Sequence, residues 1–243
     1  MPTPHAPSHW QQPFLLSERA GLFRLRFADD KLEESFRHYH LLEFLPRLKR
    51  TLKVAVFLFL MFAIVDGMTL PPPVRAGVLR LHLGVMIPVL GVVWCLLHVR
   101  KLWPWLQWVV GANAIVIGLG IVGIIWVARA HSFAMPYEGV IMATIFFYFM
   151  TGLRFTAAAV SGWAVFMAYV AMELLVGLPG KLLAYNALFL ATANLIGCFG
   201  NHYLEQALRK NFLAMEQLQR LAEHDSLTGL LNRRAFNARA AGI

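Results

Sequence analysis

Long apolar stretches separated by short polar or turn-forming segments dominate the chain from residue 51 onward. A helix needs about 20 apolar residues to cross a bilayer. Turns are marked by "PPP" at 71–73, "AMP" at 134–136 and "LPG" at 178–180, and only "LRF" separates the fourth stretch from the fifth. The pattern predicts six membrane spans, at 51–70, 80–99, 106–128, 137–153, 155–178 and 182–203.

A helical pattern also precedes the first span. In residues 28–50, apolar side chains recur every three or four positions, with acidic residues at the start and basic residues at the end, which suits the helix dipole. This predicts an amphipathic cytoplasmic helix that Pro46 bends or ends. Three roles remain open for it: leading into the first span, lying on the membrane surface, or docking on a partner chain. Residues 1–27 are expected to be loosely held.

The segment after the sixth span contains no Gly or Pro over residues 204–223 and is rich in good helix formers. It predicts an exit helix that continues the last span and acts as a coiled-coil signalling helix. Two heptad seams are possible, and the alternative of a single amphipathic linker helix is equally open. The first seam comprises Leu204, Ala207, Asn211, Ala214, Leu218 and Leu221. The second seam comprises Leu208, Phe212, Met215, Gln219 and Ala222.

Composition agrees with a membrane protein, because 58% of the 243 residues are hydrophobic and only 14% are charged. The net charge of +9 comes mostly from the membrane flanks, so nucleic acid is not an expected partner. With both termini cytoplasmic, 18 of the 22 Lys and Arg residues lie on the inner side. The fold class is therefore an all-α membrane protein with a six-helix bundle, and both termini inside.

Small residues repeat at spacings of four on several predicted spans, where they allow helices to approach closely. Gly111, Ala114 and Gly118 lie on the third span, and Ala158 and Gly162 on the fifth. These faces serve either packing within one bundle or packing between two protomers.

Polar residues gather near the outer ends of five predicted spans, where ionisable groups are costly and often functional. We expect some of them to form a shared pocket for a small ligand, the alternative being that each is wet or paired with a nearby arginine or lysine. No tight metal-ligand spacing is present, so no metal is expected. The candidate pocket residues are Asp66, His82, Glu173, Tyr185 and Asn186.

The final segment, "DSLTGLLNRRAF", resembles the opening of a GGDEF domain, the catalytic domain of diguanylate cyclases. That family begins with the pattern D-x-L-T-G-L-x-N-R-R-x-F, which is typical of a turn between two helices. Here Asn232 is placed to cap the following helix. The matching residues are Asp225, Leu227, Thr228, Gly229, Leu230, Asn232, Arg233, Arg234 and Phe236.

The resemblance implies a homodimeric protein of the bacterial inner membrane whose missing GGDEF domain uses Mg²⁺ and GTP to make cyclic di-GMP. Residues 224–243 would then be the truncated start of that domain, after the sensor at 51–203 and the signalling helix at 204–223. The chain carries no catalytic residue of the family and no cofactor, so by itself it should be inactive. "LEESF" and "YLEQALRKNF" also resemble the flanks of six-helix input domains that precede such cyclases.

Three functions remain open at this point. The first is a sensor that membrane lipid surrounds and that binds an unidentified small molecule. The others are a ligand-free anchor that dimerises the cyclase, and a transporter or other membrane protein in which the motif matches by chance. The sequence does not determine the sign of regulation, the dimer interface, or whether an EAL domain follows.

Overall fold

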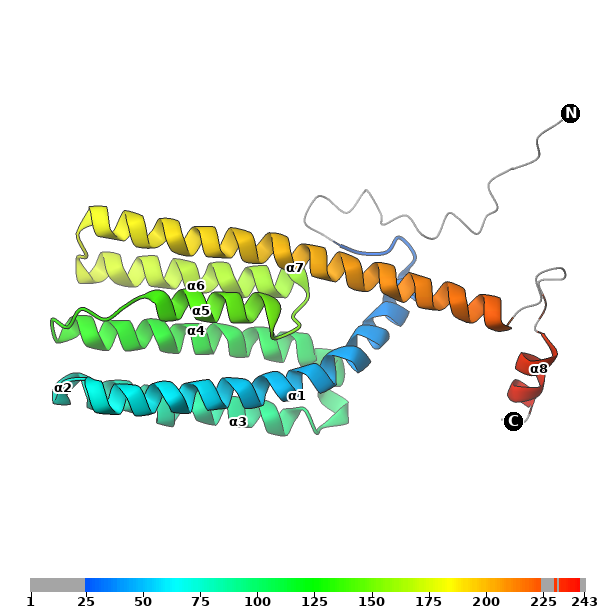
Figure 1. The fold of residues 1–243 in the computed structure, drawn as a ribbon, viewed down its shortest axis with the longest axis horizontal. Helices are drawn as coiled ribbons and strands as arrows, with labels where there is room; N and C mark the ends of the chain where they lie inside the picture. Colours follow the sequence, from blue (N-terminus) through cyan, green and yellow to red (C-terminus); the bar gives the residue numbers. More distant parts are fainter. Residues whose placement is uncertain (1–24, 224–229, 231, 241–243) are drawn as a thin grey trace, which may run out of the picture. The chain divides into compact units, whose positions relative to one another are not determined.

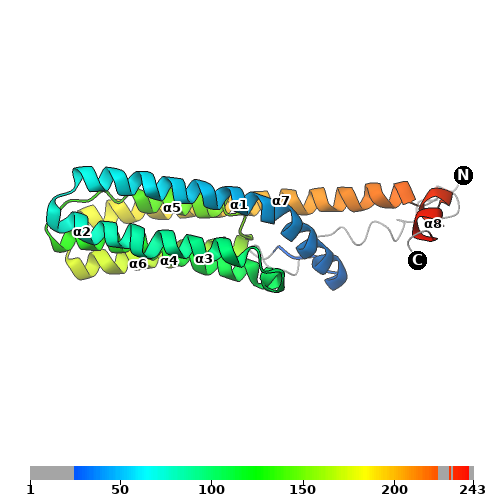
Figure 2. The same cartoon turned by 90° about the horizontal axis from the view of Figure 1, so that it is seen from below.

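The computed structural model describes residues 25–223, 230 and 232–240. Within these ranges the regular structure is entirely helical, with no strand. The helices of residues 41–203 lie lengthwise beside one another (Figures 1 and 2). The elements are α1 (Asp30–Thr69), α2 (Pro72–Leu81), η2 (His82–Met86), α3 (Ile87–Leu96), η3 (Arg100–Trp105), α4 (Leu106–Ala130), α5 (Glu138–Phe149), α6 (Phe155–Val176), α7 (Gly180–Glu223) and α8 (Arg233–Ala240).

The described residues divide into two compact units. One comprises residues 41–203. The other comprises the terminal stretches, up to residue 40 and from residue 204 onward. Helices α1 and α7 each contribute residues to both units.

Among the described residues, five helical segments are long and apolar enough to cross a membrane, which is compatible with a multi-pass membrane protein. They are Asp30–Thr69, Pro72–Leu96, Arg100–Ala130, Phe155–Val176 and Gly180–Glu223. The predicted fourth span, 137–153, is not one of these segments, because its helix, α5, has only 12 residues. At about 1.5 Å per residue it is roughly 18 Å long, well short of the hydrocarbon core of about 30 Å.

Helix α5 ends early because the chain turns at Gly152, which has a φ of 68°. The irregular backbone that follows is bonded by polar side chains from other helices. Asn201 of α7 donates to the carbonyl oxygens of Tyr148 and Leu153 at 2.7 and 3.2 Å, and Gln107 of α4 accepts from the Arg154 amide at 3.0 Å. Asn201 and Gln107 thereby bond backbone groups that have no helical partner after α5 ends.

The helix from Pro72 to Leu96 contains one wide π turn, η2, between α2 and α3. Pro88 follows this turn and has no N–H to donate to the carbonyl four residues earlier. The backbone amide of Ile87 instead bonds the His82 carbonyl oxygen, five residues back. Such π turns occur frequently at functional sites.

Helix α1 continues through Pro46 without ending, so the predicted amphipathic helix and the predicted first span belong to one helix.

Small residues bring α4 and α6 close together. Ser161 of α6 donates to the Gly111 carbonyl oxygen at 3.2 Å, and Ala158 is fully buried. A side chain added at Gly118 would overlap Val165, and one added at Gly162 would overlap Tyr148 and Asn194. These small-residue faces therefore serve packing within one chain, which decides the alternative left open by the sequence.

Replacing Gly118 with alanine should lower the melting temperature of the detergent-solubilised protein. Overpacking of this kind costs about 1–3 kcal/mol, which outweighs the roughly 1 kcal/mol that alanine contributes to helix propensity. Gly91→Ala is the matched control, since nothing lies within 4 Å of a methyl group added there. If Gly118→Ala melts at or above the temperature of Gly91→Ala, the close α4–α6 approach is wrong.

Candidate functional site

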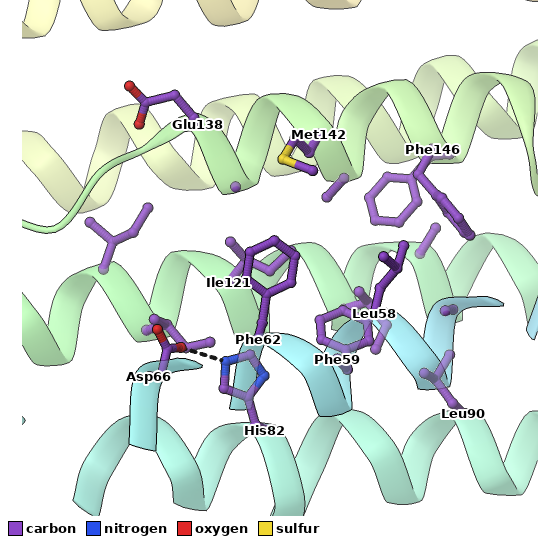
Figure 3. Close-up of a pocket in the computed structure, with 18 of the residues that line it drawn as sticks. Leu58, Phe59, Phe62, Asp66, His82, Leu90, Ile121, Glu138, Met142 and Phe146 are labelled. Atoms are coloured by element: carbon purple, nitrogen blue, oxygen red, sulfur yellow. Dashed lines mark hydrogen bonds and ion pairs between the residues drawn. The ribbon is translucent and has the colours of Figure 1, made fainter. Parts of the chain in front are cut away.

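Asp66 and His82 form a buried pair. Asp66 lies near the end of α1, and His82 opens the π turn η2. His82 Nε2 is 3.1 Å from Asp66 Oδ2, and the two residues are 4% and 9% exposed. Figure 3 shows the imidazole and the carboxylate pointing toward one another. The sequence prediction had grouped both residues in one pocket with Glu173, Tyr185 and Asn186.

The pair lines a cavity of about 660 Å³ that extends between α1 and α5, over α4 (Figure 3). This volume falls in the range of roughly 300–1,000 Å³ typical of ligand sites. On α1 the lining residues run from Leu48 to Thr69, a rise of about 32 Å. The walls are mostly aliphatic and aromatic. The polar side chains in the lining are those of Thr51, Asp66, Thr69, His82, Asn113, Glu138 and Thr151.

A second polar cluster lies where α4 and α6 end and α7 begins. Arg129 donates to Glu173 Oε1 at 3.2 Å, and Glu173 is fully buried. Asn186 donates to the Tyr169 hydroxyl at 2.9 Å. Glu173 does not line the cavity that contains Asp66.

The five predicted pocket residues therefore do not form one pocket. Asp66 and His82 line the cavity, Glu173 and Asn186 belong to the second cluster, and Tyr185 is 65% exposed. The sequence placed these residues at one depth in the membrane. It did not determine the direction each helix faces, and α6 turns Glu173 toward Arg129 on α4.

Arg209 is the centre of a buried cluster in the unit formed by the terminal stretches. Its guanidinium donates to Glu33 at 2.8 Å, to Glu205 at 2.9 Å and to the Leu25 carbonyl oxygen at 2.9 Å. It also lies 4.2 Å from the ring centroid of Phe36. Arg209 is fully buried, and burial of an arginine without such partners is very costly.

Sequence reasoning missed this cluster, although it singled out both segments that build it. Glu33 and Phe36 belong to "LEESF", and Glu205, Arg209 and Phe212 belong to "YLEQALRKNF". Phe36 and Phe212 contact each other edge to face with centroids 5.6 Å apart. The available signal was opposite charge in two amphipathic helices predicted on the same side of the membrane.

The two possible seams of the exit helix differ in their surroundings. Phe212 of the second seam is buried beside Phe27 and Phe36, and Leu208 packs against the same cluster. Every residue of the first seam is exposed: Leu204, Ala207, Asn211, Ala214, Leu218 and Leu221. The N-terminal stretch thus covers part of one seam within its own chain, and the first seam stays open to a partner.

The GGDEF-like motif lies partly within the described residues. The Ala235 amide donates to Asn232 Oδ1 at 2.9 Å, which confirms that Asn232 caps the next helix, α8. Arg233 begins α8, and Arg234 and Phe236 follow within it, while Leu230 is 69% exposed. The other motif residues lie outside the described ranges: Asp225, Leu227, Thr228 and Gly229.

In the part of the chain that the structure describes, no three His, Cys, Asp or Glu residues are grouped so that they could hold a metal ion. No protein-family model matches the chain, and no curated protein matches it. The likeness to GGDEF proteins thus rests on the residues of the motif alone.

Proposed function

We propose that this chain is the membrane-embedded input region of a diguanylate cyclase. In this role it controls synthesis of cyclic di-GMP from two GTP molecules by a GGDEF domain that follows residue 243. The observation that carries the proposal is the single helix α7, Gly180–Glu223, which leads from the apolar bundle directly to the motif.

The proposed setting is the bacterial inner membrane with both termini in the cytoplasm. The concentration of Lys and Arg outside the apolar bundle supports this orientation. In the GGDEF family the active site forms between two chains, where Mg²⁺ and GTP bind. The input region would therefore act as a homodimer, joined through the exposed first seam of α7.

Regulation requires two dimer states that a ligand distinguishes, because a ligand that binds both states equally shifts no equilibrium. The cavity beside Asp66 and His82 supplies a place for such a ligand. Its walls come from α1, α3, α4 and α5, so an occupant would alter how these helices pack. The sign of the response is left to measurement.

A second candidate function is a ligand-free anchor that only dimerises the cyclase. The exposed seam favours it as well, because Leu204, Leu218 and Leu221 would drive dimerisation without any ligand. The two functions differ in one respect, namely whether an occupant of the cavity changes cyclase activity.

The test is to express the open reading frame, including the codons after Ile243, in a bacterial strain without its own cyclases. We expect cyclic di-GMP from the longer protein and none from residues 1–243 alone. The control is the longer protein with its GG[DE]EF residues replaced. A reading frame that contains no GGDEF domain would exclude the proposal. Full, unregulated activity after exchange of residues 1–203 for an unrelated dimeric anchor would favour the anchor function.

A further inference from the structure

The Asp66 cavity opens sideways between two helices. Phe62 and Val65 of α1 and Met142 of α5 line it and are 37%, 47% and 53% exposed. Figure 3 shows Phe62 and Met142 approaching one another from facing helices. In a bilayer this face meets acyl chains, so a ligand would enter laterally from the lipid.

The ionisable side chains of the lining gather at one end of the cavity, and the long remainder is mostly apolar. Asp66, Thr69, His82 and Glu138 lie at the end where α1 finishes and α5 begins. Aliphatic and aromatic side chains from α1, α4 and α5 form most of the wall beyond them. A polar end followed by an elongated apolar wall matches an amphiphile with one extended chain.

The charges of the lining restrict the head group of such an amphiphile. Its acidic side chains are Asp66, which is bonded to His82, and Glu138, whose carboxylate points away from α1 in Figure 3. No Lys or Arg of the described residues is part of the lining. A carboxylate or phosphate placed here would meet like charge in a medium of low dielectric constant.

The hydrogen-bonding groups point to the same class of head group. The threonine hydroxyls donate to backbone carbonyls: Thr69 to Val65, Thr51 to Met150 and Thr151 to Phe147. Asp66 accepts only, as any carboxylate does. Two buried atoms of the lining have no hydrogen-bond partner, Asn113 Oδ1 and His82 Nδ1. The amide oxygen accepts, and Nδ1 of a neutral imidazole also accepts when its Nε2–H donates to Asp66. The cavity therefore offers acceptors, which suit a ligand that donates.

We propose that the Asp66 cavity binds a single-chain amphiphile whose head group donates hydrogen bonds and is not anionic, such as a long-chain alcohol or amine. This inference rests on the proposed sensor function for its biological meaning. The binding itself depends only on residues 41–203.

The test uses photoreactive probes on the purified chain in nanodiscs. The probes are a long-chain primary alcohol carrying a diazirine and a terminal alkyne, the matching amine, and the matching fatty acid in its ionised form. We expect the alcohol or the amine to label peptides of α1 and α5, with the fatty acid labelling them about tenfold less, which corresponds to roughly 1.4 kcal/mol. An excess of unlabelled alcohol should compete.

Two matched variants test the location. Ala143→Phe fills the cavity, whereas Val160→Phe places a phenylalanine on an exposed face of α6 that does not line it. Labelling should fall about tenfold in the first and persist in the second, with melting temperatures recorded to show that both are folded. Asp66→Asn provides a second probe of the polar end and should reduce the preference for the amine over the fatty acid.

Equal labelling by all three probes, or labelling that Ala143→Phe leaves unchanged in a folded protein, would overturn the inference. Failure of the proposed function looks different. In that case the probes still label the cavity, but the alcohol or amine leaves cyclic di-GMP synthesis by the longer protein unchanged. If the probes do not label the cavity but the cyclase is still regulated, the sensor function stands and this class of ligand is excluded.

Discussion

Replacement of Arg209 by methionine should release the N-terminal stretch from the part of α7 that follows residue 203. The guanidinium neutralises Glu33 and Glu205, which are 2% and 5% exposed. Removing one partner of a buried ion pair costs about 3–5 kcal/mol, because Glu33 and Glu205 would stay buried without the guanidinium that lies between them. We expect hydrogen exchange of the amides in residues 30–40 to rise on the order of a hundredfold or more.

The matched control for Arg209→Met is Arg37→Met. Arg37 also lies near Glu33, at 3.6 Å, but its side chain is 61% exposed. An exposed ion pair contributes roughly 0–1 kcal/mol, so exchange in this control should change little. Joint replacement of Arg209, Glu33 and Glu205 by apolar residues should restore protection, because a well-packed apolar cluster often equals a buried ion pair in stability. Equal exchange in Arg209→Met and Arg37→Met would contradict the structural role given to Arg209.

In the proposed cyclase, lysine at both Leu218 and Leu221 should abolish synthesis of cyclic di-GMP. The two side chains are 61% and 75% exposed, so they contribute little to the fold of one chain. In a dimer they would be buried in the seam, where each leucine contributes about 1.5–3 kcal/mol. Four leucines are lost per dimer and like charges replace them, which should weaken dimerisation far more than a hundredfold.

The control for the seam carries the same added charge on another face of α7. Gln206→Lys and Gln217→Lys lie outside both heptad seams and should leave activity and dimerisation close to those of the unmodified protein. Dimerisation is measured by crosslinking or by mass photometry in nanodiscs, and activity by cyclic di-GMP synthesis. Retention of dimers and activity in the Leu218→Lys, Leu221→Lys protein would exclude the first seam as the contact between protomers.

The Arg209 cluster also changes how the two seams are interpreted. From the heptad pattern alone the seams were equivalent, and either was able to meet a partner chain. In the structure, Phe27 and Phe36 cover Phe212 within the same chain. A contact inside the chain therefore covers Phe212 and part of Leu208, whereas Met215, Gln219 and Ala222 of the same seam stay exposed. Hydrophobic periodicity cannot foresee this contact, because it does not identify which surface a side chain meets.

The sequence predicted those features that depend on local composition. Long runs of apolar residues must be helical inside a membrane, since only a helix bonds its own backbone. Five segments of sufficient length and apolar character agree with this. The cap at Asn232 was also predictable, because it needs only a side-chain oxygen three residues before an amide.

The tertiary structure alone decided the features that depend on how each helix faces its neighbours. It shortened the fourth predicted span to α5, where Asn201 of another helix bonds the irregular backbone that follows. It divided the predicted polar pocket, directing Glu173 to Arg129 and leaving Asp66 with His82 in the cavity. The physical reason is that depth in a membrane follows from position along one helix, whereas the direction of a side chain depends on packing against residues distant in the chain.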